Sequence, residues 1–138
     1  MTTAREIMNA GVQCVKEDQN LLDAARMMRD LGVGSLPICG KDDKLHGIIT
    51  DRDIVLRCVA EGRDPASMKA GEMSGHLHWV NADDDMSHVL RTMEDNQIRR
   101  LPVLENHRLV GMVSEADIAR HLDESQIAEF VERVYAGA

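Results

Sequence analysis

The hydrophobic residues of this chain follow two alternating patterns. Apolar residues spaced three or four positions apart predict amphipathic helices at residues 21–31 and 86–94. Asn20 and Asp85 directly precede these segments and are typical N-cap residues. Short apolar runs between polar turns predict strands at residues 12–15, 36–39, 45–50, 77–80, 101–104 and 109–113. This mixture of helices and short strands indicates the α+β fold class.

The second half of the pattern repeats the first at an offset of roughly 65 residues, which is typical of a duplicated unit. Leu36-Pro37-Ile38 recurs as Leu101-Pro102-Val103. Further along, residues 47–54 recur as residues 111–118, and we call these segments the first motif and the second motif. Each copy predicts the order β-α-β-β-α. The last helix of each copy begins inside the motif, and the two are predicted at residues 51–59 and 115–122.

The predicted organisation is two repeats followed by one extra helix. Residues 1–62 form the first repeat, residues 63–123 the second, and residues 124–138 a C-terminal amphipathic helix. A repeat of about sixty residues is too small to bury two helices and both faces of a sheet by itself. We therefore expect the repeats to pack with pseudo-two-fold symmetry around a shared core. That symmetry predicts a cleft between the repeats, lined by the two motifs.

Composition and charge narrow the classes of partner. The net charge of −8 and the pI near 5.1 argue against nucleic acid, because affinity for its phosphate backbone comes from clustered Lys and Arg. No apolar run approaches the roughly 18 residues that a membrane span needs, and the N-terminus lacks the layout of a signal peptide. We therefore expect a cytoplasmic protein with neither nucleic acid nor a membrane as a partner.

Each motif has two interpretations, and the sequence leaves both open. Thr50-x-x-Asp53 and Ser114-x-x-Asp117 match a helix capping box, in which side chains and backbone N–H groups bond reciprocally. The same residues also suit a sugar phosphate. An aspartate can accept hydrogen bonds from both ribose hydroxyls, while a hydroxyl and free backbone N–H groups face the phosphate.

Arginines beside the motifs suggest that two such sites would be unequal. Arg52 lies within the first motif, where its guanidinium can fork onto phosphate oxygens. The second motif has Ala116 at this position. Arg99 and Arg100 precede the strand of the second copy, where the first copy has no basic residue. The two sites are therefore predicted to differ in phosphate affinity, with the first favoured.

The motif pattern, together with the apolar-Pro-apolar strand before it, resembles the cystathionine β-synthase (CBS) domain. Two tandem copies are similar to a Bateman module, and the resemblance covers about residues 4 to 122. It implies a non-catalytic sensor that needs no cofactor and binds AMP, ADP, ATP or a related adenosyl ligand. In that family the motif aspartate contacts the ribose hydroxyls, and the motif threonine or serine lies near the ribose or phosphate. Here the aspartates are Asp53 and Asp117, and the hydroxyl residues are Thr50 and Ser114. Ile38 and Val103 match positions that flank the base.

The resemblance also implies a flat homodimer formed through the helices, with an output to another protein that the sequence does not identify. A rival hypothesis is a structural or stress-induced dimeric protein whose motifs are only caps and which binds no nucleotide, with metal binding left open as an option. Catalysis is not expected, because the chain contains no nucleophile elbow, metalloprotease motif, P-loop or dinucleotide-binding fingerprint.

Histidines and cysteines are the remaining candidates for chemistry. His76, His78 and His88 form a weak candidate metal site, for which surface histidines without a ligand role are the simpler interpretation. Cys14 and Cys39 are predicted on neighbouring parallel strands, where a disulfide is sterically allowed. The reducing cytosol favours free, buried thiols instead, and that is the default prediction for the cysteines.

Overall fold

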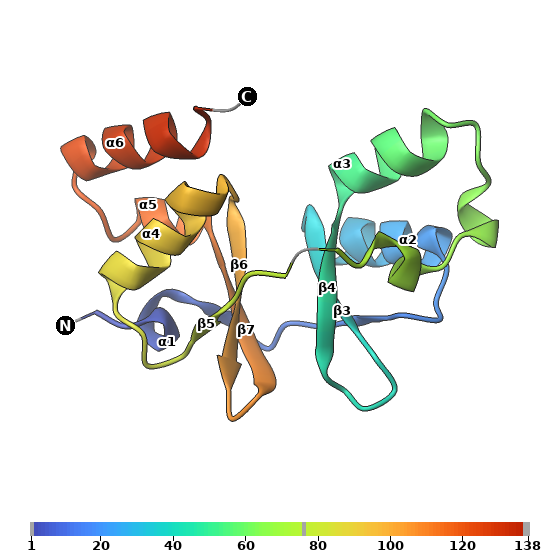
Figure 1. The fold of residues 1–138 in the computed structure, drawn as a ribbon, viewed down its shortest axis with the longest axis horizontal. Coiled ribbons are helices and arrows are strands. Elements are labelled where there is room, and N and C mark those ends of the chain that lie inside the picture. Colours follow the sequence, from blue (N-terminus) through green and yellow to red (C-terminus); the bar gives the residue numbers. More distant parts are fainter. Residues whose placement is uncertain (1, 76, 137–138) are drawn as a thin grey trace. The chain divides into compact units, whose positions relative to one another are not determined.

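The computed structural model describes residues 2–75 and 77–136, which form two compact units (Figure 1). The central unit comprises Gln13–Leu77, and the terminal unit comprises Met1–Val12 together with His78–Ala138. The placement of the two units relative to one another is not determined. The expected pseudo-two-fold packing, shared core and cleft concern that placement and stay predictions.

The central unit is a three-stranded sheet covered by helices. Its strands have the order β2-β3-β4, with β2 parallel to β3 and β3 antiparallel to β4. Leu21, Leu36 and Ile49 are among the side chains that form its core. The elements are β2 (Val15–Lys16), α2 (Leu21–Leu31), β3 (Ser35–Cys39), β4 (Leu45–Thr50), α3 (Asp51–Ile54), the π-helix η1 (Val55–Val59) and the 3-10 helices η2 (Pro65–Ser67) and η3 (Ala70–Met73).

The terminal unit is a four-stranded sheet with the order β1-β7-β6-β5. Strand β5 is parallel to β6, and β7 is antiparallel to both β6 and β1. Val103, Met93 and Phe130 belong to its core. The elements are α1 (Ala4–Ile7), β1 (Asn9–Ala10), β5 (Val80–Asn81), α4 (Met86–Asn96), β6 (Arg100–Glu105), β7 (Arg108–Ser114), α5 (Glu115–Ala119) and α6 (Glu124–Val134).

The helices and hairpins lie close to where the sequence predicts them. Helix α2 has the predicted bounds, and Asn20 caps it in a capping box with Asp23. Helix α4 begins after the predicted Asp85 cap but continues to Asn96, because Gln97 takes the left-handed conformation that ends the helix. Helices α2, α4 and α6 have 11 residues each, and no helix within the described ranges is long and apolar enough to cross a membrane.

The N-terminal segment of each repeat packs against the motif strand of the other repeat, which the sequence analysis did not predict. In the terminal unit, β1 pairs with β7, and Ala10 lies opposite Gly111. A Cβ atom on Gly111 would lie 2.9 Å from the backbone oxygen of Asn9. In the central unit, a Cβ atom on Gly47 would lie 3.1 Å from the Cα atom of Ser74. The first glycine of each motif therefore makes room for a crossing backbone.

Replacing Gly111 with alanine is expected to lower the free energy of unfolding by about 1–3 kcal/mol, because the new methyl group overlaps Asn9 and Met8. Urea denaturation measures this change. Gly75→Ala is the matched control, since nothing lies within 4 Å of its Cβ position, and its effect should stay within about 1 kcal/mol. Equal unfolding free energies for the two variants would contradict the close crossing.

Candidate functional site

The two motifs occupy equivalent strand-to-helix junctions. The first motif joins β4 to α3, and the second joins β7 to α5. Thr50 lies opposite Ser35 in its sheet, and Ser114 lies opposite Arg100. The first N–H of each helix donates to the residue directly before the strand that pairs with the motif strand: Asp51 to the Gly34 carbonyl at 2.9 Å and Glu115 to the Arg99 carbonyl at 3.1 Å. The residues before the apolar-Pro-apolar strand therefore lie beside the motif hydroxyl in both units.

Both predicted capping boxes are present. Thr50 Oγ1 accepts the Asp53 N–H at 3.0 Å, and Asp53 Oδ2 accepts the Thr50 N–H at 2.9 Å. Ser114 Oγ accepts the Asp117 N–H at 3.3 Å, and Asp117 Oδ2 accepts the Ser114 N–H at 2.9 Å. A carboxylate has about four acceptor positions, so a cap occupies only part of its capacity.

The two aspartates differ in how much of that capacity is used. Asp53 is half-buried, and its Oδ1 accepts no hydrogen bond from any residue in the described part of the chain. Asp117 is only 8% exposed. Its Oδ2 also accepts the Ser114 hydroxyl at 3.0 Å, and its Oδ1 accepts from Arg120 Nη1 at 3.1 Å. The first motif therefore presents the more open carboxylate.

Arg120 was missed in the sequence analysis, although the three-residue spacing from Asp117 is a recognisable signal for a pair on one helical face. Tyr135 was also missed as a site residue. Its hydroxyl donates to Glu115 Oε2 at 3.1 Å and accepts from Arg99 Nη1 at 3.2 Å. No local pattern predicts this contact, because Tyr135 and Glu115 are 20 residues apart.

The predicted phosphate-binding arginines lie beside their motifs. Arg52 is exposed on α3, and Arg100 is half-buried on β6 opposite Ser114. Neither guanidinium forms a hydrogen bond or ion pair with another residue of the described ranges. The Arg99 guanidinium instead lies over the Tyr135 ring, 5.3 Å from its centroid.

The predicted base-flanking residues lie within the cores. Ile38 and Val103 are 0% exposed and pack in the core of the central and the terminal unit, respectively. Each lies on the strand paired with its motif strand, opposite the motif glycine: Ile38 faces Gly47 across the sheet, and Val103 faces Gly111. The backbones of Ile38 and Val103 therefore lie next to the motifs, whereas their side chains are part of the hydrophobic cores.

The candidate metal site is only partly described. His78 is half-buried, and His88 Nε2 lies 3.7 Å from Asp84 Oδ2. His76 lies outside the described residues. Among residues 2–75 and 77–136, no group of three or more His, Cys, Asp or Glu side chains is placed to hold a metal ion.

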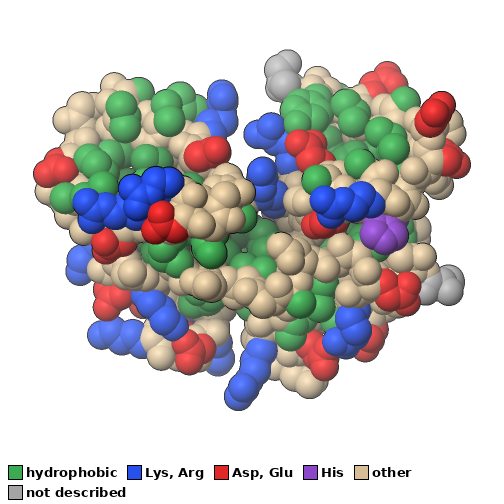
Figure 2. All heavy atoms as spheres, turned by 180° about the vertical axis from the view of Figure 1, so that it is seen from behind, with side chains coloured by type: hydrophobic (Ala, Val, Ile, Leu, Met, Phe, Trp, Pro, Cys, Tyr) green, Lys and Arg blue, Asp and Glu red, His purple; other side chains and the backbone are tan. Residues whose placement is uncertain are grey.

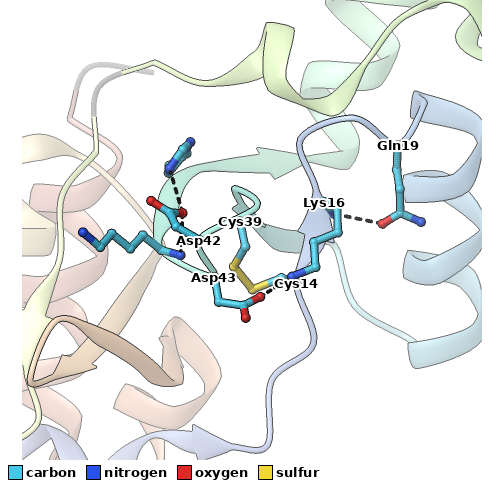
Figure 3. The surroundings of a disulfide bond; sticks show 8 residues. Cys14, Lys16, Gln19, Cys39, Asp42 and Asp43 are labelled. Atoms are coloured by element: carbon cyan, nitrogen blue, oxygen red, sulfur yellow. Dashed lines mark hydrogen bonds and ion pairs between the residues drawn. A yellow bond between two sulfur atoms is a disulfide. The ribbon is translucent and has the colours of Figure 1, made fainter.

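Cys14 and Cys39 form a disulfide in the central unit, with their Cα atoms 5.7 Å apart (Figure 3). The parallel pairing of β2 with β3 brings them together, because Lys16 lies opposite Cys39. Lys16 also forms an ion pair with Asp43 beside the bond. The default prediction of reduced thiols is therefore wrong for these two cysteines. It agrees with the structure for Cys58, which is free and buried.

The disulfide predicts a thiol count. Without reductant, unfolded protein should react with iodoacetamide at Cys58 alone, because the other two sulfurs are bonded to each other. After reduction, all three cysteines should react, and peptide mass spectrometry gives both counts. Alkylation of Cys14 and Cys39 in unreduced protein would contradict the bond.

Comparison with known proteins gives the family relation. The family model of the CBS domain matches residues 4–59 and 70–124. Hypoxic response protein 1 of Mycobacterium tuberculosis is 53% identical over 135 residues, which cover 97% of this chain and 94% of that protein.

Two solved structures resemble the fold over most of the chain. A crystal structure of Hypoxic Response Protein I with two coordinated zinc ions has a TM-score of 0.82 and 54% identity, covering 88% of this chain and all of the other. The hexameric CBS-CP12 protein from bloom-forming cyanobacteria has a TM-score of 0.80 and 29% identity, covering 91% of this chain and 74% of the other. Both structures thus support the fold class predicted from the sequence.

Proposed function

The chain belongs to the CBS-domain family, and from that premise we propose that it is a non-catalytic sensor of an adenine nucleotide or a related adenosyl ligand. The open carboxylate of Asp53 is the observation that carries this proposal. Its Oδ1 is free to accept hydrogen bonds while its Oδ2 holds the helix cap. Since a ribose offers two adjacent hydroxyl donors, cap and ligand can share one side chain.

The surroundings of Asp53 suit the phosphate end of the same ligand. Arg52 is adjacent in the chain, exposed, and without a partner in the described ranges. A guanidinium matches phosphate oxygens in pairs, which gives both attraction and orientation. AMP, ADP and ATP share the ribose and the first phosphate, so this arrangement supports adenine nucleotides as a class.

If the first motif binds a nucleotide, AMP, ADP or ATP at millimolar concentration should raise the melting temperature of the wild-type protein. A ligand at about 100 times its Kd stabilises the folded state by about 2.7 kcal/mol. Asp53→Ala should abolish this rise, because it removes the ribose acceptor. Differential scanning fluorimetry with each nucleotide measures both effects.

The control separates ligand binding from capping. Asp23→Ala breaks the capping box of α2, so it should lower the free energy of unfolding by about 1 kcal/mol, as the loss of the Asp53 cap should. The nucleotides should still raise the melting temperature of Asp23→Ala as much as that of the wild-type protein. A wild-type protein whose melting temperature is unchanged by all three nucleotides would refute the sensor hypothesis and leave the capping role alone.

We also propose that the protein is a homodimer, acts in a stress response from the cytoplasm, and passes its signal to another protein. Val55, Leu56 and Val59 support the dimer, because these apolar side chains on η1 are 54%, 46% and 60% exposed. Figure 2 shows hydrophobic side chains on the exposed surface of both units. Apolar clusters of this kind mark interaction surfaces.

The dimer predicts a mass in solution of twice 15.4 kDa. Replacing both Val55 and Val59 with aspartate should give monomers, because each new charge would have to be buried without a partner. Val33→Asp is the control, since Val33 is 40% exposed but lies outside α3 and η1. Sedimentation velocity distinguishes the species, and a monomeric wild-type protein would contradict the proposal.

A further inference from the structure

The second motif has little capacity left for a ribose. Asp117 accepts hydrogen bonds from the Ser114 N–H, the Ser114 hydroxyl and Arg120 Nη1. A carboxylate offers about four acceptor positions, so about one remains, whereas a ribose brings two adjacent donors. Asp53 accepts only the Thr50 N–H and keeps about three positions. The two repeats thus contain the same motif, but the aspartate acceptor positions are mostly occupied in the second motif and mostly free in the first.

The C-terminal end of helix α6 also contacts residues beside the second motif. Its Tyr135 end bonds Glu115 at 3.1 Å and Arg99 at 3.2 Å, and these two residues are themselves joined by a backbone hydrogen bond. Glu115 directly follows Ser114, and Arg99 directly precedes the residue opposite Ser114. Tyr135 therefore ties the end of the C-terminal helix to the start of α5 and to the residue that precedes β6.

Helix α6 packs against the terminal unit through its C-terminal half, and a local cap begins the helix. Phe130 and Val134 are 2% and 4% exposed in the core of this unit. Asp123 caps the start of α6, and hydrogen bonds from the Gln126 N–H and the Ser125 hydroxyl hold the pKa of Asp123 below its ordinary value. Figure 1 shows α6 beside α4 and α5. A hollow of about 260 Å³, lined by Ala116, Ala119, Ile127 and Val131 among others, separates part of α6 from α5.

The central unit has no such cover within its described residues. By the repeat offset, Val55 is the counterpart of Ala119 and Leu56 the counterpart of Arg120. Val55 and Leu56 are 54% and 46% exposed, and leucine cannot donate to Asp53. Arg120 and the C-terminal helix are thus additions to one repeat only.

We propose that Arg120 and Tyr135 hold the second motif closed, so that an adenine nucleotide occupies the first motif alone until the C-terminal helix and Arg120 move away. This inference rests on the proposed nucleotide-binding function and specifies which motif binds. Arg120 and Tyr135 are positioning residues, since they act through Asp117 and Glu115. Arg100 remains beside Ser114 to meet a phosphate once the motif opens.

Counting bound AMP by isothermal titration calorimetry tests the closure. Wild-type protein should bind one AMP per chain, and Asp53→Ala should bind none. Adding Arg120→Ala and Tyr135→Phe to Asp53→Ala should restore one site, because Asp117 regains the acceptor that Arg120 occupied. Adding Arg120→Lys alone should leave the site closed, since lysine can still donate to Asp117.

Arg29→Ala in the Asp53→Ala background is the matched control. Arg29 and Arg120 each pair with an aspartate and have side chains that are 71% exposed, but the partner of Arg29 is the exposed Asp30, which belongs to neither motif. This control should bind no AMP. Binding by Asp53→Ala alone, or by the Arg29 control, would overturn the proposal. So would an opened variant that binds none when the wild-type protein binds one.

A second measurement needs no nucleotide. Carbodiimide with glycine ethyl ester converts accessible carboxyl groups to amides, and peptide mass spectrometry gives the rate at each aspartate. In wild-type protein Asp53 should be labelled several-fold faster than Asp117, and Arg120→Ala with Tyr135→Phe should bring Asp117 close to the Asp53 rate. Equal rates in the wild-type protein would refute the closure. If AMP fails to bind the wild-type protein, the proposed function is wrong, and this labelling still decides whether the second motif is closed.

Discussion

The close crossing at the motif glycines is the constraint on which the rest of the structure depends. Each unit is completed by the N-terminal segment of the repeat that forms the other unit: Asn9 and Ala10 pair with β7, and Ser74 crosses at Gly47. A side chain at either glycine would meet backbone within about 3 Å. Because each repeat supplies a segment to the other unit, a single repeat lacks part of its own fold. The duplication is therefore a structural requirement as well as a doubling of the motif.

This exchange explains why the compact units do not coincide with the sequence repeats. The central unit is continuous in the chain, whereas the terminal unit joins Met1–Val12 to His78–Ala138. The family model, by contrast, matches two successive segments, because it follows the order of residues along the chain. The first glycine of the motif thus has a packing role, and the proposed ligand contacts fall to the hydroxyl and the aspartate that follow.

Local signals made much of the fold and the motif geometry predictable. The helix caps at Asn20, Asp85, Thr50 and Ser114 use bonds between residues three apart, so the sequence contains all of their information. The pairing of β1 with β7 was not predictable, since two residues carry no periodicity and their partners lie about a hundred residues away. The disulfide was foreseen only as an alternative, because strand neighbours were inferable but the state of the thiols was not.

The difference between the two motifs follows from competition for one carboxylate. An aspartate at the third position of a helix stabilises the fold through its cap, and each further donor it accepts adds stability while removing an acceptor from any ligand. In the terminal unit the extra donors are Arg120 and the Ser114 hydroxyl, and Tyr135 fastens the neighbouring Glu115. In the central unit the cap alone is satisfied, and an exposed arginine stands next to it. A duplicated fold can therefore contain the motif residues in both copies, although the aspartate has free acceptor positions for a further hydrogen bond mainly in one of them.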